Sequence, residues 1–174
     1  MIKKYLIIMV FILSGTHLYA KTHHAPKVTH PYLIVDRSSD DLSKKRIIEK
    51  AEEYLGVSYG FGNKNEIKTD CSGFTQQVFK EFGLSLPGSA ALQSKYGSKV
   101  DLKDLQVGDL LFYRTYKKEP SHVAIYAGNG QIIHASYRSK KVQYDDIDKR
   151  YYKQRFMYAK RLALNEQTLE SKQN

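Results

Sequence analysis

Apolar residues in the first half of the chain recur with the spacing of amphipathic helices. One such stripe runs through residues 43–55, next to Gly56, and a second runs from Cys71 to about residue 82, before Gly83. Glycine directly after an apolar stripe is a common helix stop, so the pattern predicts two helices, with a loop at residues 56–65. The stripes consist of Ile47, Ile48, Ala51, Tyr54 and Leu55 in the first helix and of Phe74, Val78, Phe79 and Phe82 in the second.

Short apolar segments replace the helical pattern in the second half of the chain. The pattern predicts strands, with one short helical segment at residues 145–152 between the last two. The expected strands are residues 110–113, 122–127, 131–136, 142–144 and 156–164. Helices that precede a set of antiparallel strands are typical of the α+β class, with the second helix packed on an antiparallel sheet.

The run Gly128-Asn129-Gly130 predicts a β-hairpin, and a histidine lies on each side of it. A two-residue turn would send His122 and His134 to opposite faces of the sheet, whereas an odd loop or a bulge would put both on one face. On one face they would lie within roughly 5 to 8 Å of each other. We predict the odd loop or bulge.

Both ends of the chain differ from the segment between them. Residues 1–20 carry two lysines close to their start, Lys3 and Lys4, continue with an apolar run and end in the small residue Ala20. That layout predicts a secretory signal, because the apolar run is too short for a stable membrane anchor. We therefore expect an exported protein, periplasmic or secreted, with an irregular arm at residues 21–43, a catalytic domain at residues 44–164 and a flexible tail at residues 165–174. The arm's His23, His24 and His30 have no acidic or cysteine partners, which favours an arm over a metal site.

The chain of 174 residues carries a formal net charge of +10. Residues 1–20 hold two lysines and no acids, so without them the charge is 10 − 2 = +8. Such an excess indicates an anionic partner, although cations also serve simply to solvate a surface. For an exported protein a carboxylate-rich cell wall is a better partner than nucleic acid, for which the sequence contains no recognisable binding motif.

Cys71 is the only cysteine, so it has no partner for a disulfide within the chain. Asp70 is a good N-cap, which makes Cys71 the first residue of the second helix. The positive end of the helix dipole stabilises a thiolate there and lowers the thiol pKa, and backbone N–H groups can hold an oxyanion. The alternative is a cysteine that serves only as a small core residue.

A cysteine nucleophile needs a base that titrates near neutral pH, which points to histidine. Of the hairpin's two histidines, one can take the Cys71 proton while the other orients its ring. The combination of a single cysteine at a helix start with two histidines on one hairpin predicts a cysteine hydrolase.

Four segments of the chain resemble motifs of the NlpC family of cell-wall cysteine peptidases, in particular its single-domain NlpC- and Spr-like members. The resemblance extends from about residue 44 to residue 162. The matching segments are DCSGF at residues 70–74, VGDLLF at 107–112, HVAIYAGNG at 122–130 and HAS at 134–136.

This resemblance implies a papain-like fold and a role for each matching residue. Cys71 would be the nucleophile, His122 the base and His134 the third member that orients it. Tyr59 matches a tyrosine that lies beside the thiolate and assists the oxyanion. Asp70 and Ser72 match positions that bind the substrate's free amine in some members, although helix capping alone explains Asp70. The chain departs from many relatives at Gly88, where they carry an arginine.

The resemblance also implies a peptidoglycan endopeptidase that cuts γ-D-glutamyl–diaminopimelate or D-alanyl–diaminopimelate bonds through a thioester. Such an enzyme requires no metal or cofactor, and we expect a monomer. One alternative keeps the chemistry in an amidase, an acyltransferase or a secreted antibacterial effector. Another is a wall-binding module without catalysis, against which the intact Cys71, His122 and His134 argue.

Overall fold

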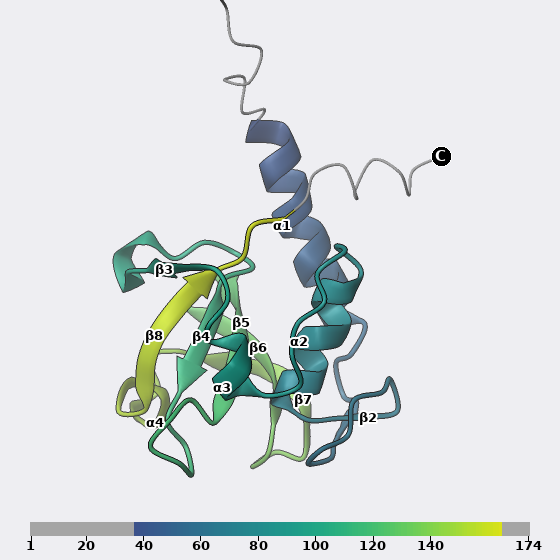
Figure 1. Cartoon of the computed structure of the whole chain (residues 1–174), viewed down its shortest axis with the longest axis vertical. Coiled ribbons are helices and arrows are strands. Elements are labelled where there is room, and N and C mark those ends of the chain that lie inside the picture. The colour runs from purple at the N-terminus through teal and green to yellow at the C-terminus, as the bar shows by residue number, and fades with distance from the viewer. Residues whose placement is uncertain (1–36, 165–174) are drawn as a thin grey trace, which may run out of the picture. The chain divides into compact units, whose positions relative to one another are not determined.

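The computed structural model describes residues 37–164, which Figure 1 shows in colour. The expected signal at residues 1–20, most of the expected arm with its three histidines, and the expected tail lie outside the described residues. No helix among the described residues is long and apolar enough to cross a membrane.

Helix α1 (Arg37–Glu52) begins earlier than predicted, so the last residues of the expected irregular arm are helical. Its early part is stabilised by an ion pair one turn apart, Asp40 with Lys44 at 2.5 Å, rather than by an apolar stripe. Hydrophobic spacing therefore could not detect this part of the helix. The helix also ends before Leu55, which is 44% exposed, so its assignment to the apolar stripe was wrong.

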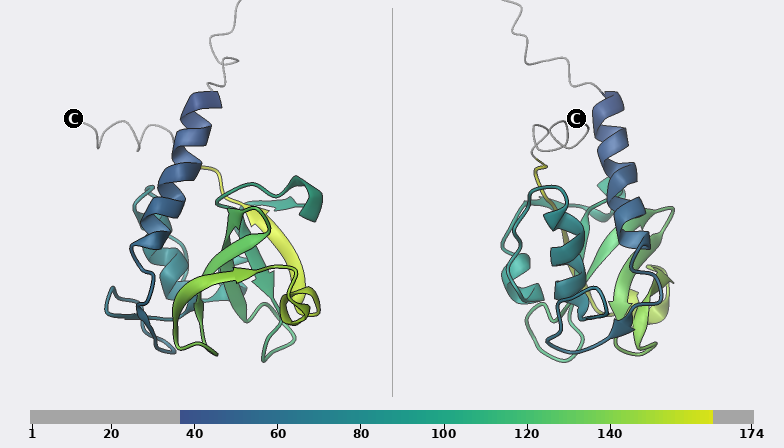
Figure 2. Two further views of the ribbon diagram at one scale, coloured as in Figure 1. Left: turned by 180° about the vertical axis from the view of Figure 1, so that it is seen from behind. Right: turned by 90° about the vertical axis from the view of Figure 1, so that its right-hand side faces the viewer.

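Helix α2 (Cys71–Lys80) begins where the sequence predicted it. The Asp70 carboxylate accepts a hydrogen bond of 2.7 Å from the Gly73 N–H and caps the helix. The predicted apolar side chains of the second stripe are all buried, and Tyr54 packs edge-on against Phe74 with ring centroids 5.9 Å apart. The right-hand view of Figure 2 shows α1 and α2 on the same side of the sheet.

The sheet has eight strands in the order β2-β1-β7-β6-β5-β4-β8-β3. Only β1 and β2 pair in parallel, so a mixed sheet replaces the purely antiparallel one expected, and the α+β, papain-like class is confirmed. The strands are β1 (Ser58–Tyr59), β2 (Lys68–Thr69), β3 (Ser98–Val100), β4 (Leu110–Tyr113), β5 (His122–Gly128), β6 (Gln131–Ser136), β7 (Lys141–Asp146) and β8 (Phe156–Arg161).

Three further elements are single turns: α3 (Ala90–Gln93), a 3-10 turn (Leu102–Asp104) and α4 (Arg150–Lys153). Strand β7 extends through Asp146, so residues 145 and 146 belong to a strand and not to the helical segment predicted at residues 145–152. The strands β1, β2 and β3 escaped prediction because two or three residues are too few to show a period.

Alternating residues of the central strands form two separate cores. One core contacts α1 and α2 and includes Leu110, Phe112 and Val123. The other lies on the opposite face and includes Leu111, Ala124 and Tyr152 of α4. Because strand side chains alternate between faces, even-numbered residues of β5 and β6 share the α4 side.

The hairpin between β5 and β6 contains the predicted bulge. Tyr126 pairs with Ile132, but Gly128 pairs with Gln131, so one residue of β5 is unmatched. Asn129 has a φ of +52°, flanked by glycines that also have positive φ, which suits asparagine and glycine. The bulge keeps His122 and His134 on one face, as the sequence predicted.

Candidate active site

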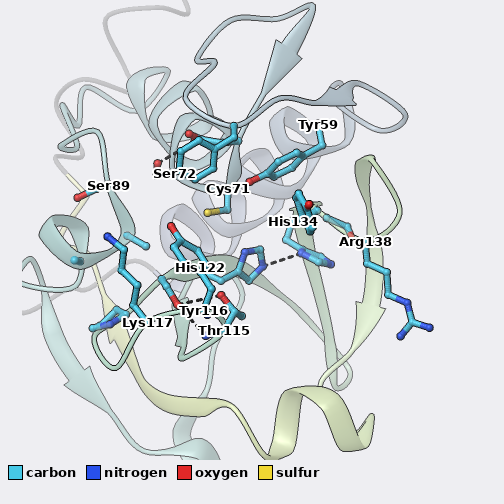
Figure 3. Close-up of a pocket in the computed structure, with 18 of the residues that line it drawn as sticks. Tyr59, Cys71, Ser72, Ser89, Thr115, Tyr116, Lys117, His122, His134 and Arg138 are labelled. Atoms are coloured by element: carbon cyan, nitrogen blue, oxygen red, sulfur yellow. Dashed lines mark hydrogen bonds between the residues drawn. The ribbon is translucent and has the colours of Figure 1, made fainter.

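A cleft of about 920 Å³ opens at the N-terminal end of α2. All six residues selected from the sequence line it: Tyr59, Asp70, Cys71, Ser72, His122 and His134. They come from β1, the start of α2, β5 and β6, and Figure 3 shows Tyr59, Ser72, His122 and His134 around the Cys71 side chain. The loop at residues 115–121 and the turn at residues 136–139 complete the walls.

The Cys71 sulfur lies against the beginning of β5, where the backbone N–H of Val123 donates to it. Cys71 is 8% exposed and is the first residue of α2. Packing of α2 on β5 therefore brings the thiol next to His122, the residue that precedes Val123. Figure 3 shows the sulfur and the His122 ring facing the same cavity.

Burial raises the pKa of the Cys71 thiol to about 11 and outweighs the N–H groups of Val123 and Ser72, which lower it. Burial, together with the neighbouring His134, lowers the pKa of His122 well below its ordinary value. At neutral pH both groups are therefore uncharged in the free protein. The expectation of a low thiol pKa was wrong, because it considered the helix end and not the desolvation of the sulfur.

Alkylation of Cys71 by iodoacetamide should therefore accelerate by about tenfold per pH unit from about pH 6 to pH 9, because only the thiolate reacts. Cys71 is the only cysteine, so Cys71→Ala provides the unlabelled control. A labelling rate that levels off below about pH 8 would show instead that His122 already holds the thiol proton in the free protein.

His122 belongs to a chain of polar side chains that crosses the sheet face. Its Nε2 lies 2.9 Å from His134 Nδ1, and His134 Nε2 lies 3.1 Å from Asp145 Oδ2. Both histidines are buried, at 9% and 2% exposure. Since Nε2 is engaged by His134, Nδ1 is the nitrogen of His122 left to face the thiol.

Asp145 is the member of this chain that sequence reasoning missed. Its Oδ2 accepts hydrogen bonds from the Tyr152 hydroxyl at 2.7 Å and from Gln143 Nε2 at 3.0 Å, and its Oδ1 pairs with Lys149. Burial alone would raise the pKa of Asp145, but hydrogen bonds from His134, Lys149, Tyr152 and Gln143 hold it well below its usual range. The site thus contains a permanent anion behind His134.

Tyr59 lies on β1, and Figure 3 shows its hydroxyl pointing toward the Cys71 sulfur. The Tyr59 backbone N–H donates to Lys140 O at 2.8 Å, and its ring meets Tyr137 edge-on at 5.5 Å. Burial, and after it the negative charge that Cys71 gains once its own thiol ionises, raises the pKa of Tyr59, so its hydroxyl remains a hydrogen-bond donor at neutral pH.

Asp70 and Ser72 lie beside Cys71 and bind a cation of the chain itself. Lys64 Nζ lies 3.4 Å from Asp70 Oδ1 and 3.2 Å from Ser72 Oγ, and Ser72 Oγ also donates to Asp70 Oδ1 at 2.9 Å. The loop that carries Lys64 passes so close to α2 that a Cβ on Gly73 would lie 2.8 Å from Asn63 O. A steric clash therefore explains why residue 73 of the DCSGF segment is a glycine. Lys64 was not selected from the sequence, because nothing local marks one loop lysine among many.

The side chains described from residue 40 to residue 164 contain no group of three or more histidines, cysteines and acids arranged to hold a metal ion.

Comparisons with known proteins identify relatives of this chain. The model of the NlpC/P60 family matches residues 56–161. The murein DD-endopeptidase MepS/murein LD-carboxypeptidase of Escherichia coli (strain K12) is 38% identical over 120 residues, which are 68% of this chain and 63% of that protein. A probable endopeptidase NlpC homolog of Haemophilus influenzae is 34% identical, over 73% of this chain and 67% of that one. The chain thus spans less than two thirds of the E. coli protein's length.

Solved structures share the fold. An NLP/P60 family protein of Staphylococcus aureus, similar to lipoprotein, superposes with a TM-score of 0.66 at 31% identity, over 72% of this chain and 43% of that one. An NlpC/P60 family protein of Bacillus cereus gives 0.65 at 31% identity, over 68% of this chain and 39% of that one. Since the family model covers more than half of the chain and its relatives agree in sequence and fold, this chain belongs to the NlpC/P60 family.

Proposed function

We propose that the protein is an exported peptidoglycan endopeptidase that hydrolyses an amide bond of the stem peptide or cross-link through a thioester on Cys71. The observation that carries this proposal is that one cleft holds both the Cys71 thiol and His122, whose Nε2 lies 2.9 Å from His134 Nδ1. Relatives named murein DD-endopeptidase and probable endopeptidase support the choice of substrate.

In the proposed reaction His122 Nδ1 takes the Cys71 proton as the sulfur attacks the amide carbon. Because both groups are neutral at rest, proton transfer accompanies attack rather than preceding it. The Tyr59 hydroxyl and the N–H groups at the start of α2 hold the negative oxygen of the tetrahedral intermediate. The C–N bond then breaks, and His122 returns the proton to the leaving amine.

Water completes the cycle. His122, neutral again, takes a proton from water as the oxygen attacks the thioester, and the C–S bond breaks to release the acid and restore the thiol. His134 and Asp145 stabilise the imidazolium that forms in both halves of the reaction, because the carboxylate stays ionised throughout.

Purified wall sacculi provide the test. After the glycan has been digested, sacculi treated with the protein should release peptide fragments, each with the mass expected for addition of water, and sacculi treated with Cys71→Ala should release no more of them than sacculi kept in buffer. The variant is a suitable control because it removes only a sulfur from a well-packed helix start. Equal release by both proteins would contradict the proposal. Products that carry an acceptor in place of water would indicate an acyltransferase.

A further inference from the structure

We infer that Lys64 fills an ammonium site in the cleft, so that the enzyme acts on stem peptides whose terminal amine is acylated rather than free. This inference rests on the proposed function. It concerns the part of the cleft formed by Asp70, Ser72 and Gly88, next to Cys71.

Asp70 and Ser72 together offer oxygen acceptors for one ammonium group at the cleft wall. The side chain of Asp70 is 10% exposed, and its carboxylate is fixed by N–H groups of Gly73 at 2.7 Å and Gly62 at 2.9 Å. These contacts anchor the anion in place beside the nucleophile. A carboxylate with a hydroxyl is a general recognition pair for a protonated amine.

The ammonium that occupies this position is that of Lys64. Its Nζ lies 3.4 Å from both Asp70 oxygens and 3.2 Å from Ser72 Oγ, with the side chain 34% exposed. An internal cation competes with a substrate amine at a high effective concentration, on the order of millimolar or above. A free substrate amine would have to displace Lys64 and leave one of the two cations without the carboxylate.

Gly88 gives Lys64 the space to reach this position. A Cβ at residue 88 would lie 3.2 Å from Lys64 Cε, closer than an undisturbed contact. The Gly88 carbonyl oxygen also lies 3.0 Å from Ser72 Oγ, which places the same backbone beside the cluster. Lys64 can therefore occupy this position undisturbed because residue 88 has no side chain.

An acylated amine has no charge and forms no ion pair with Asp70, so it can bind in the cleft without displacing Lys64. Stem peptides still attached to glycan strands carry their terminal amine as an amide. Peptides already released from the glycan carry it as an ammonium. The geometry therefore favours wall-attached substrate over released peptide.

Two stem peptides of the same sequence, one with a free terminal amine and one acetylated there, provide the test. We expect the wild-type protein to cleave the acetylated peptide with the higher kcat/KM. Lys64→Met should shift the ratio toward the free amine by about tenfold, the value of a charge-assisted hydrogen bond gained by the substrate. Lys64→Arg, which keeps the cation, should retain the wild-type preference.

Lys117→Met is the matched control, because Lys117 is a cation of the same cleft that pairs with Glu119 at 3.9 Å and not with Asp70. It should leave the ratio unchanged. An unchanged ratio in Lys64→Met, with cleavage intact, would overturn the inference about Lys64. Failure of the wild-type protein to cleave sacculi would instead contradict the proposed function.

Discussion

Replacing His122 with alanine should slow peptide release from sacculi by about 10² to 10⁴-fold, the usual contribution of a positioned proton-transfer group. Both Cys71 and His122 are neutral at rest, so without His122 the thiol loses the base assigned to it and keeps its proton up to a pKa of about 11. The loss should fall on kcat, because the histidine acts on reacting atoms and not on substrate binding. Initial rates of peptide release at several sacculus concentrations provide the measurement.

The pH dependence of the His122→Ala variant checks the same assignment. Its residual rate should climb with pH as hydroxide ionises the thiol, whereas the wild-type rate should already be high at neutral pH. The folded state can be verified by circular dichroism, since His122 lies at the start of β5 and its removal spares the strand pairing. A variant that keeps more than about a tenth of the wild-type rate at neutral pH would remove His122 from the mechanism.

Asp145→Asn should lower kcat by about 10- to 100-fold while KM stays nearly constant, an effect of the size seen when a group that supports a reacting residue is changed. Asparagine keeps the size of the side chain but loses the charge. The Asp145 charge raises the pKa of His122, so its removal makes His122 a weaker base and moves the acid limb of the kcat profile to lower pH. A merely structural role would not produce that displacement.

Asp148→Asn is the matched control for Asp145→Asn. Asp148 is an exposed acid close by, and its carboxylate pairs with Lys153 at 2.7 Å rather than with a histidine. Its replacement should leave both kcat and the acid limb unchanged. If Asp145→Asn behaves like Asp148→Asn, the anion behind His134 has no part in catalysis.

The shared face of His122 and His134 could be predicted because side chains alternate between the two faces along a strand, which the sequence numbers alone reveal. Two even-numbered residues and a glycine-rich turn were enough to require a bulge, which the structure contains. Asp145 lies on the same face because it pairs with Ile132 of β6, but the sequence placed residues 145–152 in a helical segment. The strand continues to Asp146 because β6 is there to pair with it, which local propensity does not reveal.

The ionisation state of the Cys71 thiol could not be predicted for a related reason. A helix start is visible in the sequence, and Asp70 does cap α2. The burial of the sulfur depends on β5 and on loops distant in the sequence that close over the same cleft. Desolvation is thus a property of the assembled fold, and it exceeds the stabilisation that the helix end offers to a thiolate. Lys64 is a similar case, since its role depends on the missing side chain at Gly88.

The place of β8 in the sheet determines when the domain can be completed. This strand, the last among the described residues, pairs with β4 on one side and β3 on the other. Before residues 156–161 have been synthesised, β4 lacks one of its neighbours and β3 has nothing to pair with, so the buried face around Ala159 stays open. The proposed hydrolase would therefore leave the ribosome as a chain that assembles late.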